Sequence, residues 1–248
     1  MQKKRLPPGT KNTSVLGLGL SQAVPGFNAL PNVEKEIDAI VRTPKNDNKG
    51  IFPGNEFLNK NFDYTALRDN LRGHNILHIA THGEFVPGRQ DDSFLVLGTG
   101  KKLPIPEIEK LRDLGDINLV VLSACETALG ETNKQDGIEI HGISFYFLKQ
   151  GAKSVISSLW KVDDPSTAKL MQQFYSNLAT DAHPTKAEAL RQAQLSLLRG
   201  NNSTTANTNP RGISVTPETG TSPRNQQLAS EYSHPYYWAP FILIGNGL

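Results

Sequence analysis

The chain has 248 residues, of which 37% are hydrophobic, and its 26 Lys and Arg residues against 24 Asp and Glu give a formal net charge of +2. A chain of this length and composition buries a core of its own, which predicts one large α/β domain. The charges are spread along the sequence without forming a basic stripe, so we expect no direct nucleic-acid partner.

The compartment is indicated by the single cysteine, Cys125, which has no partner within the chain for a disulfide and suits a reducing environment. The apolar stretch 15–20 contains two glycines and is not closed by a cleavage site, so it predicts a first strand and not a signal peptide. No run reaches the roughly 18 apolar residues of a membrane span. We therefore expect a cytoplasmic protein without a membrane partner.

Short β-branched runs alternate with helical patterns along the chain. Helix 165–180 has a clear start signal, with Asp164 as the expected cap and Pro165 at the first helical position. In chain order the expected elements are strand 15–20, helix 32–41, helix 63–72, strand 75–82, strand 93–98, strand 118–125, helix 137–150, strand 153–160, helix 165–180, helix 186–199 and strand 238–245.

The strands "INLVVLSA" and "KSVISSLW" are almost continuously apolar, which indicates burial on both faces of a sheet. They predict a mostly parallel sheet of about six strands in a three-layer α/β/α sandwich. Residues 201–233 are crowded with Asn, Thr, Ser, Pro and Gly, and we interpret them as a flexible low-complexity insertion. The domain is expected to span 14–248, after a disordered segment at 1–13.

Two expected strands end in residues that carry chemistry. "NILHIATHG" ends in His82 and Gly83, and "NLVVLSACET" ends in Cys125, which lies 43 residues after His82. That separation allows one crossover, so the two strands can be neighbours whose carboxyl ends meet at one edge. A thiol needs a base or a cation to attack a carbonyl, and His82 can supply either, while the backbone N–H groups of Gly83 and Cys125 can face the oxyanion. From position alone, Cys125 as buried filler stays open.

Other sites are less well supported by the sequence. His74, His78 and His82 recur every four residues, but four residues of strand span about 13 Å, too far to share one metal ion, so no metal is expected. We expect His78 to be buried and hydrogen-bonded. Ser123 lacks the G-x-S-x-G setting of a serine nucleophile. No phosphate-binding glycine loop is present, so we expect no nucleotide or other cofactor.

The strings "HIATHG", "LSACETA", "GAKSVISSLWKVDDPSTAKLMQQFY", "KAEALRQAQ" and "YYWAPFILIG" together resemble the CHAT domain. This caspase-like family is often fused to tetratricopeptide repeats, and cyanobacterial members are especially similar. The resemblance implies a caspase–haemoglobinase fold and cysteine-peptidase chemistry, with His82 and Cys125 as the dyad and Gly83 and Cys125 as oxyanion donors. This chain carries no repeat region, so we expect either a separate regulatory protein or a larger parent protein.

The stretch "SLWKVDDPST" follows another expected strand and brings Trp160, Asp163 and Asp164 near the same crevice. A carboxylate there can select a basic residue on the acyl side of the cut, by a bidentate contact if that residue is arginine. Separase is similar in this stretch and favours arginine. The alternative is structural, with Asp164 acting only as a helix cap and Asp163 only solvated.

The sequence as a whole thus predicts a caspase-like cysteine endopeptidase that hydrolyses peptide bonds in protein or peptide substrates. The alternative is a catalytically silent caspase-like module that binds partner proteins in a signalling complex. The reactivity of the Cys125 thiol separates the two, because only a dyad makes that thiol depend on His82.

Overall fold

A computed structural model describes residues 6, 12–44, 49–86, 88–123, 142–180, 184–200 and 231–248. Its main sheet has seven strands in the order β10-β9-β8-β4-β1-β3-β2, all parallel except β10, which runs antiparallel to β9. The predicted, mostly parallel sheet is confirmed. Its strands are β1 (Val15–Gly19), β2 (Val41–Arg42), β3 (Phe52–Leu58), β4 (Ile76–Ala80), β8 (Leu119–Ser123), β9 (Ser154–Ser158) and β10 (Phe241–Gly245).

A second, three-stranded antiparallel sheet has the order β5-β6-β7, with β5 at Gly83–Glu84, β6 at Phe94–Val96 and β7 at Lys102–Pro104. The expected strand 93–98 belongs to this small sheet and not to the main one. Strand β3 was not predicted, because its sequence FPGNEFL contains Pro, Gly and Asn, which are depleted in strands. Its backbone pairing with β1 outweighs that local preference.

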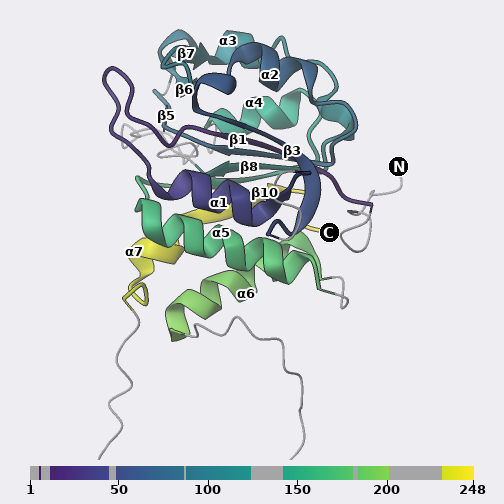
Figure 1. Cartoon of the computed structure of the whole chain (residues 1–248), viewed down its shortest axis with the longest axis vertical. Helices are drawn as coiled ribbons and strands as arrows, with labels where there is room; N and C mark the ends of the chain where they lie inside the picture. The colour runs from purple at the N-terminus through teal and green to yellow at the C-terminus, as the bar shows by residue number, and fades with distance from the viewer. Residues whose placement is uncertain are drawn as a thin grey trace, which may run out of the picture.

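Helices cover both faces of the main sheet (Figure 1). Helices α1, α5 and α6 lie on one face, and α2, α3 and α4 lie on the other. The predicted three-layer sandwich is therefore confirmed. The helices are α1 (Asn32–Ile40), α2 (Tyr64–Asp69), α3 (Ile105–Ile108), α4 (Ile143–Lys149), α5 (Asp164–Leu178), α6 (Lys186–Arg199) and α7 (Pro235–Trp238), and short 3-10 turns lie at Asn59–Asn61, Gln90–Asp92 and Leu114–Asp116.

Strand β4 shows how alternating residues of one strand contribute to the two cores on either side of the main sheet. Ile76 and Ala80 pack toward α1 and α5, whereas Leu77 and Ile79 pack toward α2, α3 and α4. This alternation follows from the two-residue period of a strand. On β1, beside this strand, Gly17 leaves room for α1 and β2, because a Cβ there would lie 3.1 Å from Ile37 of α1 and 2.8 Å from Val41 of β2.

Several expected boundaries were wrong, including the following three. The cap of α5 is Asp163, whose carboxylate accepts a hydrogen bond from Ser166 N at 3.1 Å, so the expected cap at Asp164 is one residue late. Trp238 belongs to α7, and β10 begins only at Phe241. For the expected helix 137–150 the structure shows α4 from Ile143, and residues 137–141 lie outside the described residues.

The two segments expected to be irregular fall mainly outside the described part of the chain. Of 201–233, the structure describes only the last three residues. Of 1–13 it describes three, and among them Leu6 is buried in the core that α1 and α5 share, while Thr13 is buried before β1. No helix within the described ranges has both the length and the apolar composition that crossing a membrane requires.

Lys186 gives a testable stability effect. Its side chain is fully buried at the start of α6, where Nζ donates to the Asn118 carbonyl oxygen at 3.4 Å, and burial lowers the pKa of Lys186 to about 8. The unfolded chain therefore binds more protons than the folded one between about pH 8 and the ordinary lysine pKa of 10.5, so stability rises with pH through this window.

We expect Lys186→Met to raise the thermal unfolding midpoint near pH 7, because methionine fills the site without a charge to desolvate. The variant should also lose the rise in stability above about pH 8. Thermal unfolding of both proteins at pH values on either side of this window measures the effect. A gap between wild type and variant that stays constant with pH contradicts the assignment.

Candidate active site at the carboxyl edge of the sheet

Strands β4 and β8 are parallel neighbours and end at the same level. Ala80 is the register partner of Ser123, and one residue further on Thr81 N donates to Ser123 O at 3.3 Å. His82 follows β4 by two residues, and Cys125 follows β8 by two. The expected pairing of these two strands is confirmed, whereas Cys125 itself, like all of 124–141, lies outside the described residues.

His82 is held from one side by the loop between β1 and α1. Its Nε2 lies 2.8 Å from the Asn28 carbonyl oxygen, and the Phe27 ring packs against the imidazole with the ring centroids 5.2 Å apart and the planes tilted by 35°. A carbonyl oxygen only accepts hydrogen bonds, so Nε2 carries a proton and donates it here. In the neutral imidazole Nδ1 is therefore the nitrogen that can accept a proton.

The loop that supplies Phe27 and Asn28 is itself fixed. Phe27 and Val24 exchange two backbone hydrogen bonds, of 2.9 and 3.1 Å, around Gly26, which has a φ of 86°. At its start, Asn59 Oδ1 accepts from Ser21 N at 2.9 Å. These contacts make a tight turn that presents one ring and one carbonyl to His82, which favours a single orientation of the imidazole.

The Phe27 ring has a second support in the small sheet. It makes an edge contact with Phe94, at a centroid distance of 6.2 Å, and the ammonium group of Lys102 lies 3.8 Å from the centre of the Phe94 ring. Aromatic and cation–π contacts of this kind restrict ring orientation as well as adding stability. His82 is thus packed through two rings onto β6 and β7.

Gly83 begins β5, and its N–H is positioned by the small sheet. Val96 N donates to the carbonyl oxygen of His82 at 2.8 Å, and Gly83 is the next residue, paired with Leu95. Hydrogen-bonded and non-hydrogen-bonded pairs alternate along an antiparallel ladder, so the Gly83 N–H points away from β6. The Gly83 N–H therefore points toward the outer edge of the small sheet.

The three residues expected to bind substrate follow β9. Trp160 Nε1 donates to the carbonyl oxygen of Tyr236 in α7 at 3.2 Å. Asp163 caps α5 through one carboxylate oxygen, and Asp164 Oδ2 accepts from both the backbone and the side-chain nitrogen of Asn32, at 3.0 and 2.8 Å. Both carboxylates are only half-buried and each has a structural partner.

Aromatic residues lie close to Asp163. The rings of Tyr232 and Tyr237 meet at a centroid distance of 5.3 Å, and Lys169 Nζ lies 5.3 Å from the Tyr232 ring. Burial, together with the charges of Glu231 and Asp163, raises the pKa of Tyr232.

The remaining histidines have structural partners. His78 is fully buried, as predicted, with Nε2 2.9 Å from Glu36 Oε1 and Nδ1 3.0 Å from the Tyr175 hydroxyl. Burial and the nearby Glu36 carboxylate raise the pKa of Tyr175. His74 contacts the carbonyl oxygen of Asn70 at 2.7 Å, and burial lowers the pKa of His74. Within the part of the chain that is described, no three His, Cys, Asp or Glu side chains are grouped to hold a metal ion.

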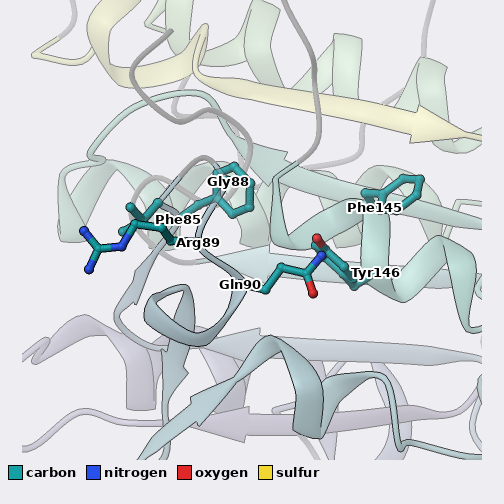
Figure 2. Close-up of a pocket in the computed structure, with 7 residues that line it drawn as sticks. Phe85, Gly88, Arg89, Gln90, Phe145 and Tyr146 are labelled. Atoms are coloured by element: carbon teal, nitrogen blue, oxygen red, sulfur yellow. The ribbon is translucent and has the colours of Figure 1, made fainter. Parts of the chain in front are cut away.

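A cavity of about 560 Å³ opens beside the segment that leaves the active-site edge after β5. Its described lining comes from the segment after β5, with Phe85, Arg89 and Gln90, and from α4, with Phe145 and Tyr146 (Figure 2). Neither this cavity nor the contacts of Phe27 and Asn28 were predicted from the sequence. The contact of Asn28 with His82 could not be predicted, because it is made by a backbone carbonyl, which all residue types share.

Comparison with known proteins places the chain in a family. The family model described as CHAT domain matches residues 3–246, which is nearly the whole chain. No curated protein sequence matches. Three solved structures of low sequence identity are similar to this chain.

A structure described as a protease is 14% identical, with a TM-score of 0.55, over 97% of this chain and 48% of its own. The separase–securin complex of Saccharomyces cerevisiae is 16% identical, with a TM-score of 0.51, over 77% and 11%. Porphyromonas gingivalis RgpB is 9% identical, with a TM-score of 0.48, over 78% and 45%.

At these identities the first two likenesses show a shared fold, and the chain spans less than half the length of each of the three structures. The caspase–haemoglobinase-like fold implied by the sequence motifs is confirmed. Because the family model covers the sheet, both helical layers and the segments that contain His82 and Cys125, the chain belongs to the CHAT domain family.

Proposed function

We propose that this protein is a cysteine endopeptidase in which His82 and Cys125 form the catalytic dyad. The observation that carries the proposal is the register of β4 and β8, in which Ala80 pairs with Ser123 two residues before His82 and Cys125 respectively. Two residues span at most about 7 Å of chain, so Cys125 stays close to the end of β8. The orientation of His82 by Asn28 adds support, because it leaves Nδ1 as the proton acceptor.

The reaction follows from these roles. The Cys125 sulfur attacks the carbonyl carbon of the scissile peptide bond and its proton passes to His82 Nδ1, while the backbone N–H groups of Gly83 and Cys125 hold the oxyanion. The C–N bond then breaks and the leaving amine takes the proton from His82. Water, deprotonated by His82, hydrolyses the thioester to release the acid and restore the thiol.

The substrate is proposed to be a protein or peptide with a basic residue on the acyl side of the cut. Asp163 is the better supported of the two carboxylates, since Asp164 is bound by two donors of Asn32, while Asp163 caps α5 through one oxygen and lies close enough to Tyr232 for its charge to raise the pKa of that phenol. A guanidinium group can bind the second oxygen of Asp163 and stack on a ring.

An Asp163→Asn variant separates specificity from helix capping, because asparagine caps a helix about as well as aspartate but carries no charge. We expect the variant to keep the wild-type unfolding midpoint and to lose about 10-fold or more in kcat/KM for peptides with arginine before the cut. Cleavage of peptide pairs that differ only by arginine or norleucine at this position measures the change. An unaltered ratio between the two peptides contradicts a role for Asp163 in selection.

The proposed activity itself is tested by mapping the cleavage sites that the chain produces in a denatured proteome, with Cys125→Ala as the matched control. We expect new termini that depend on Cys125. Identical sets of termini with wild type and variant, over long incubation and with added cell extract as a source of activator, would favour the silent interaction module.

A further inference from the structure

The cavity beside β5 has a preformed wall. Ser93 Oγ accepts from Val86 N at 2.8 Å and donates to the carbonyl oxygen of Arg89 at 2.9 Å, and its side chain is fully buried. Gly88, with a φ of 72°, completes the turn, in which Arg89 N donates to Val86 O at 3.1 Å. The turn is thus held by its own hydrogen bonds, and the side chains that line the cavity start from a fixed backbone.

The opposite wall is the first part of α4. Tyr146 is 7% exposed and belongs to the core on this face, whereas Phe145 is 38% exposed, with its ring at right angles to that of Tyr146 at a centroid distance of 5.3 Å. Phe85, across the cavity, packs on the same core. Three aromatic residues from two separate segments therefore line this space (Figure 2).

The charges around the cavity do not suit an ionic ligand. Arg89 is already paired with Asp92 through Nη2 and Oδ2. The rest of the described lining is aromatic, aliphatic or the neutral amide of Gln90. A volume of about 560 Å³ lies within the range of sites for small organic groups, and such a lining favours an apolar occupant with one or two hydrogen-bonding atoms.

The cavity also begins two residues along the chain from the proposed active site, since Phe85 lines it. Phe85 follows Gly83 by two residues, so their Cα atoms are at most about 7 Å apart. Two residues of an extended peptide span about the same distance. A peptide whose scissile carbonyl faces the Gly83 N–H can therefore place a side chain two or three positions away in this cavity.

We propose that the cavity is a specificity subsite that binds a large apolar side chain, aromatic or branched aliphatic, of the peptide substrate. This inference rests on the proposed peptidase function for its position along the substrate. Leucine or phenylalanine suits a lining that contains three aromatic residues, and the exposed amide of Gln90 can hydrogen-bond to the peptide backbone. Acidic side chains and glycine are disfavoured, because they lose the apolar contact and an acidic group must also be desolvated.

The test uses binding, so that it does not depend on turnover. Fluorescently labelled pentapeptides that place leucine, phenylalanine, aspartate or glycine at each position in turn are titrated against the full chain carrying Cys125→Ala. We expect one position at which leucine and phenylalanine bind about 10-fold more tightly than aspartate and glycine. In the Cys125→Ala chain, a further Phe145→Ala substitution should reduce this preference to about twofold. Phe145→Leu in its place should retain most of the preference.

Leu198→Ala is the matched control, because Leu198 is 42% exposed on α6, on the other face of the sheet, and should leave the preference unchanged. No apolar preference at any position, or a preference that persists in Phe145→Ala, overturns the subsite. If the preference depends on Phe145 but the wild type cleaves nothing, the subsite stands and the peptidase assignment is the one that fails.

Discussion

Replacing His82 with alanine should lower kcat for peptide hydrolysis by about 10²–10⁴-fold, and replacing Cys125 with alanine should abolish hydrolysis. The first change removes the group that takes the thiol proton and later protonates the leaving amine. The second removes the atom that bonds to the substrate. Initial rates on a peptide identified from the cleavage map measure both effects.

His234→Asn is the control for this series. His234 caps α7 by accepting from Tyr236 N at 3.2 Å, and asparagine is also a good cap, so this variant removes a histidine without removing its structural contact. We expect its rate to match that of the wild type. If His82→Ala retains more than about a tenth of the wild-type rate, His82 has no acid–base role of the expected size.

Replacing His78 with leucine should cost about 3–5 kcal/mol of folding stability, because it leaves the buried Glu36 carboxylate without its partner. Glu36, His78 and Tyr175 lie on α1, β4 and α5, and each side chain is at most 1% exposed. Their hydrogen bonds therefore join two helices to the sheet in a place that water does not reach. Urea unfolding of wild type and variant measures the loss.

A double-mutant cycle tells this network apart from simple packing. Glu36→Leu and His78→Leu should each be strongly destabilising, but the double variant should be more stable than the sum of the two losses predicts, because no lone charge remains buried. Arg68→Ala, which breaks an exposed pair with Asp69, should leave the unfolding midpoint unchanged. Losses that add to within about 0.5 kcal/mol would show that Glu36 and His78 do not act as a pair.

The pairing of β4 with β8 was predictable because their sequences are typical of central strands of a parallel sheet. Both strands are buried on both faces, and the separation of His82 from Cys125 fits one crossover. The adjacency of the two strand ends that precede His82 and Cys125 therefore followed from local patterns, whereas the position of Cys125 itself stays a prediction. The family motifs then gave the fold, which a periodicity argument alone leaves among several α/β classes.

What could not be predicted depends on contacts between distant segments. Asp163 and Asp164 are both suitable caps for α5 by residue type. The structure shows that Asp163 caps the helix through Ser166 N, while Asp164 is bound by Asn32, which lies 132 residues away in the chain. His82 is oriented by the backbone carbonyl of Asn28. Because every residue has a backbone carbonyl, the residue type does not indicate this contact. The cavity that Phe145 and Phe85 share forms between segments about 60 residues apart, so no local pattern indicates it.

The most direct test of the dyad is the rate at which iodoacetamide labels Cys125, measured from about pH 5 to pH 9 in the wild type and in His82→Ala. A thiol with the ordinary pKa near 8.5 is about 3% thiolate at pH 7. Because the thiolate is the form that reacts, full ionisation of Cys125 beside an imidazolium would raise the labelling rate by at most about 30-fold. We predict that wild-type labelling at pH 7 is at least about 10-fold faster than labelling of His82→Ala. Equal rates in the two proteins, both rising only near the ordinary thiol pKa, would contradict the assignment of His82 and Cys125 to one active site.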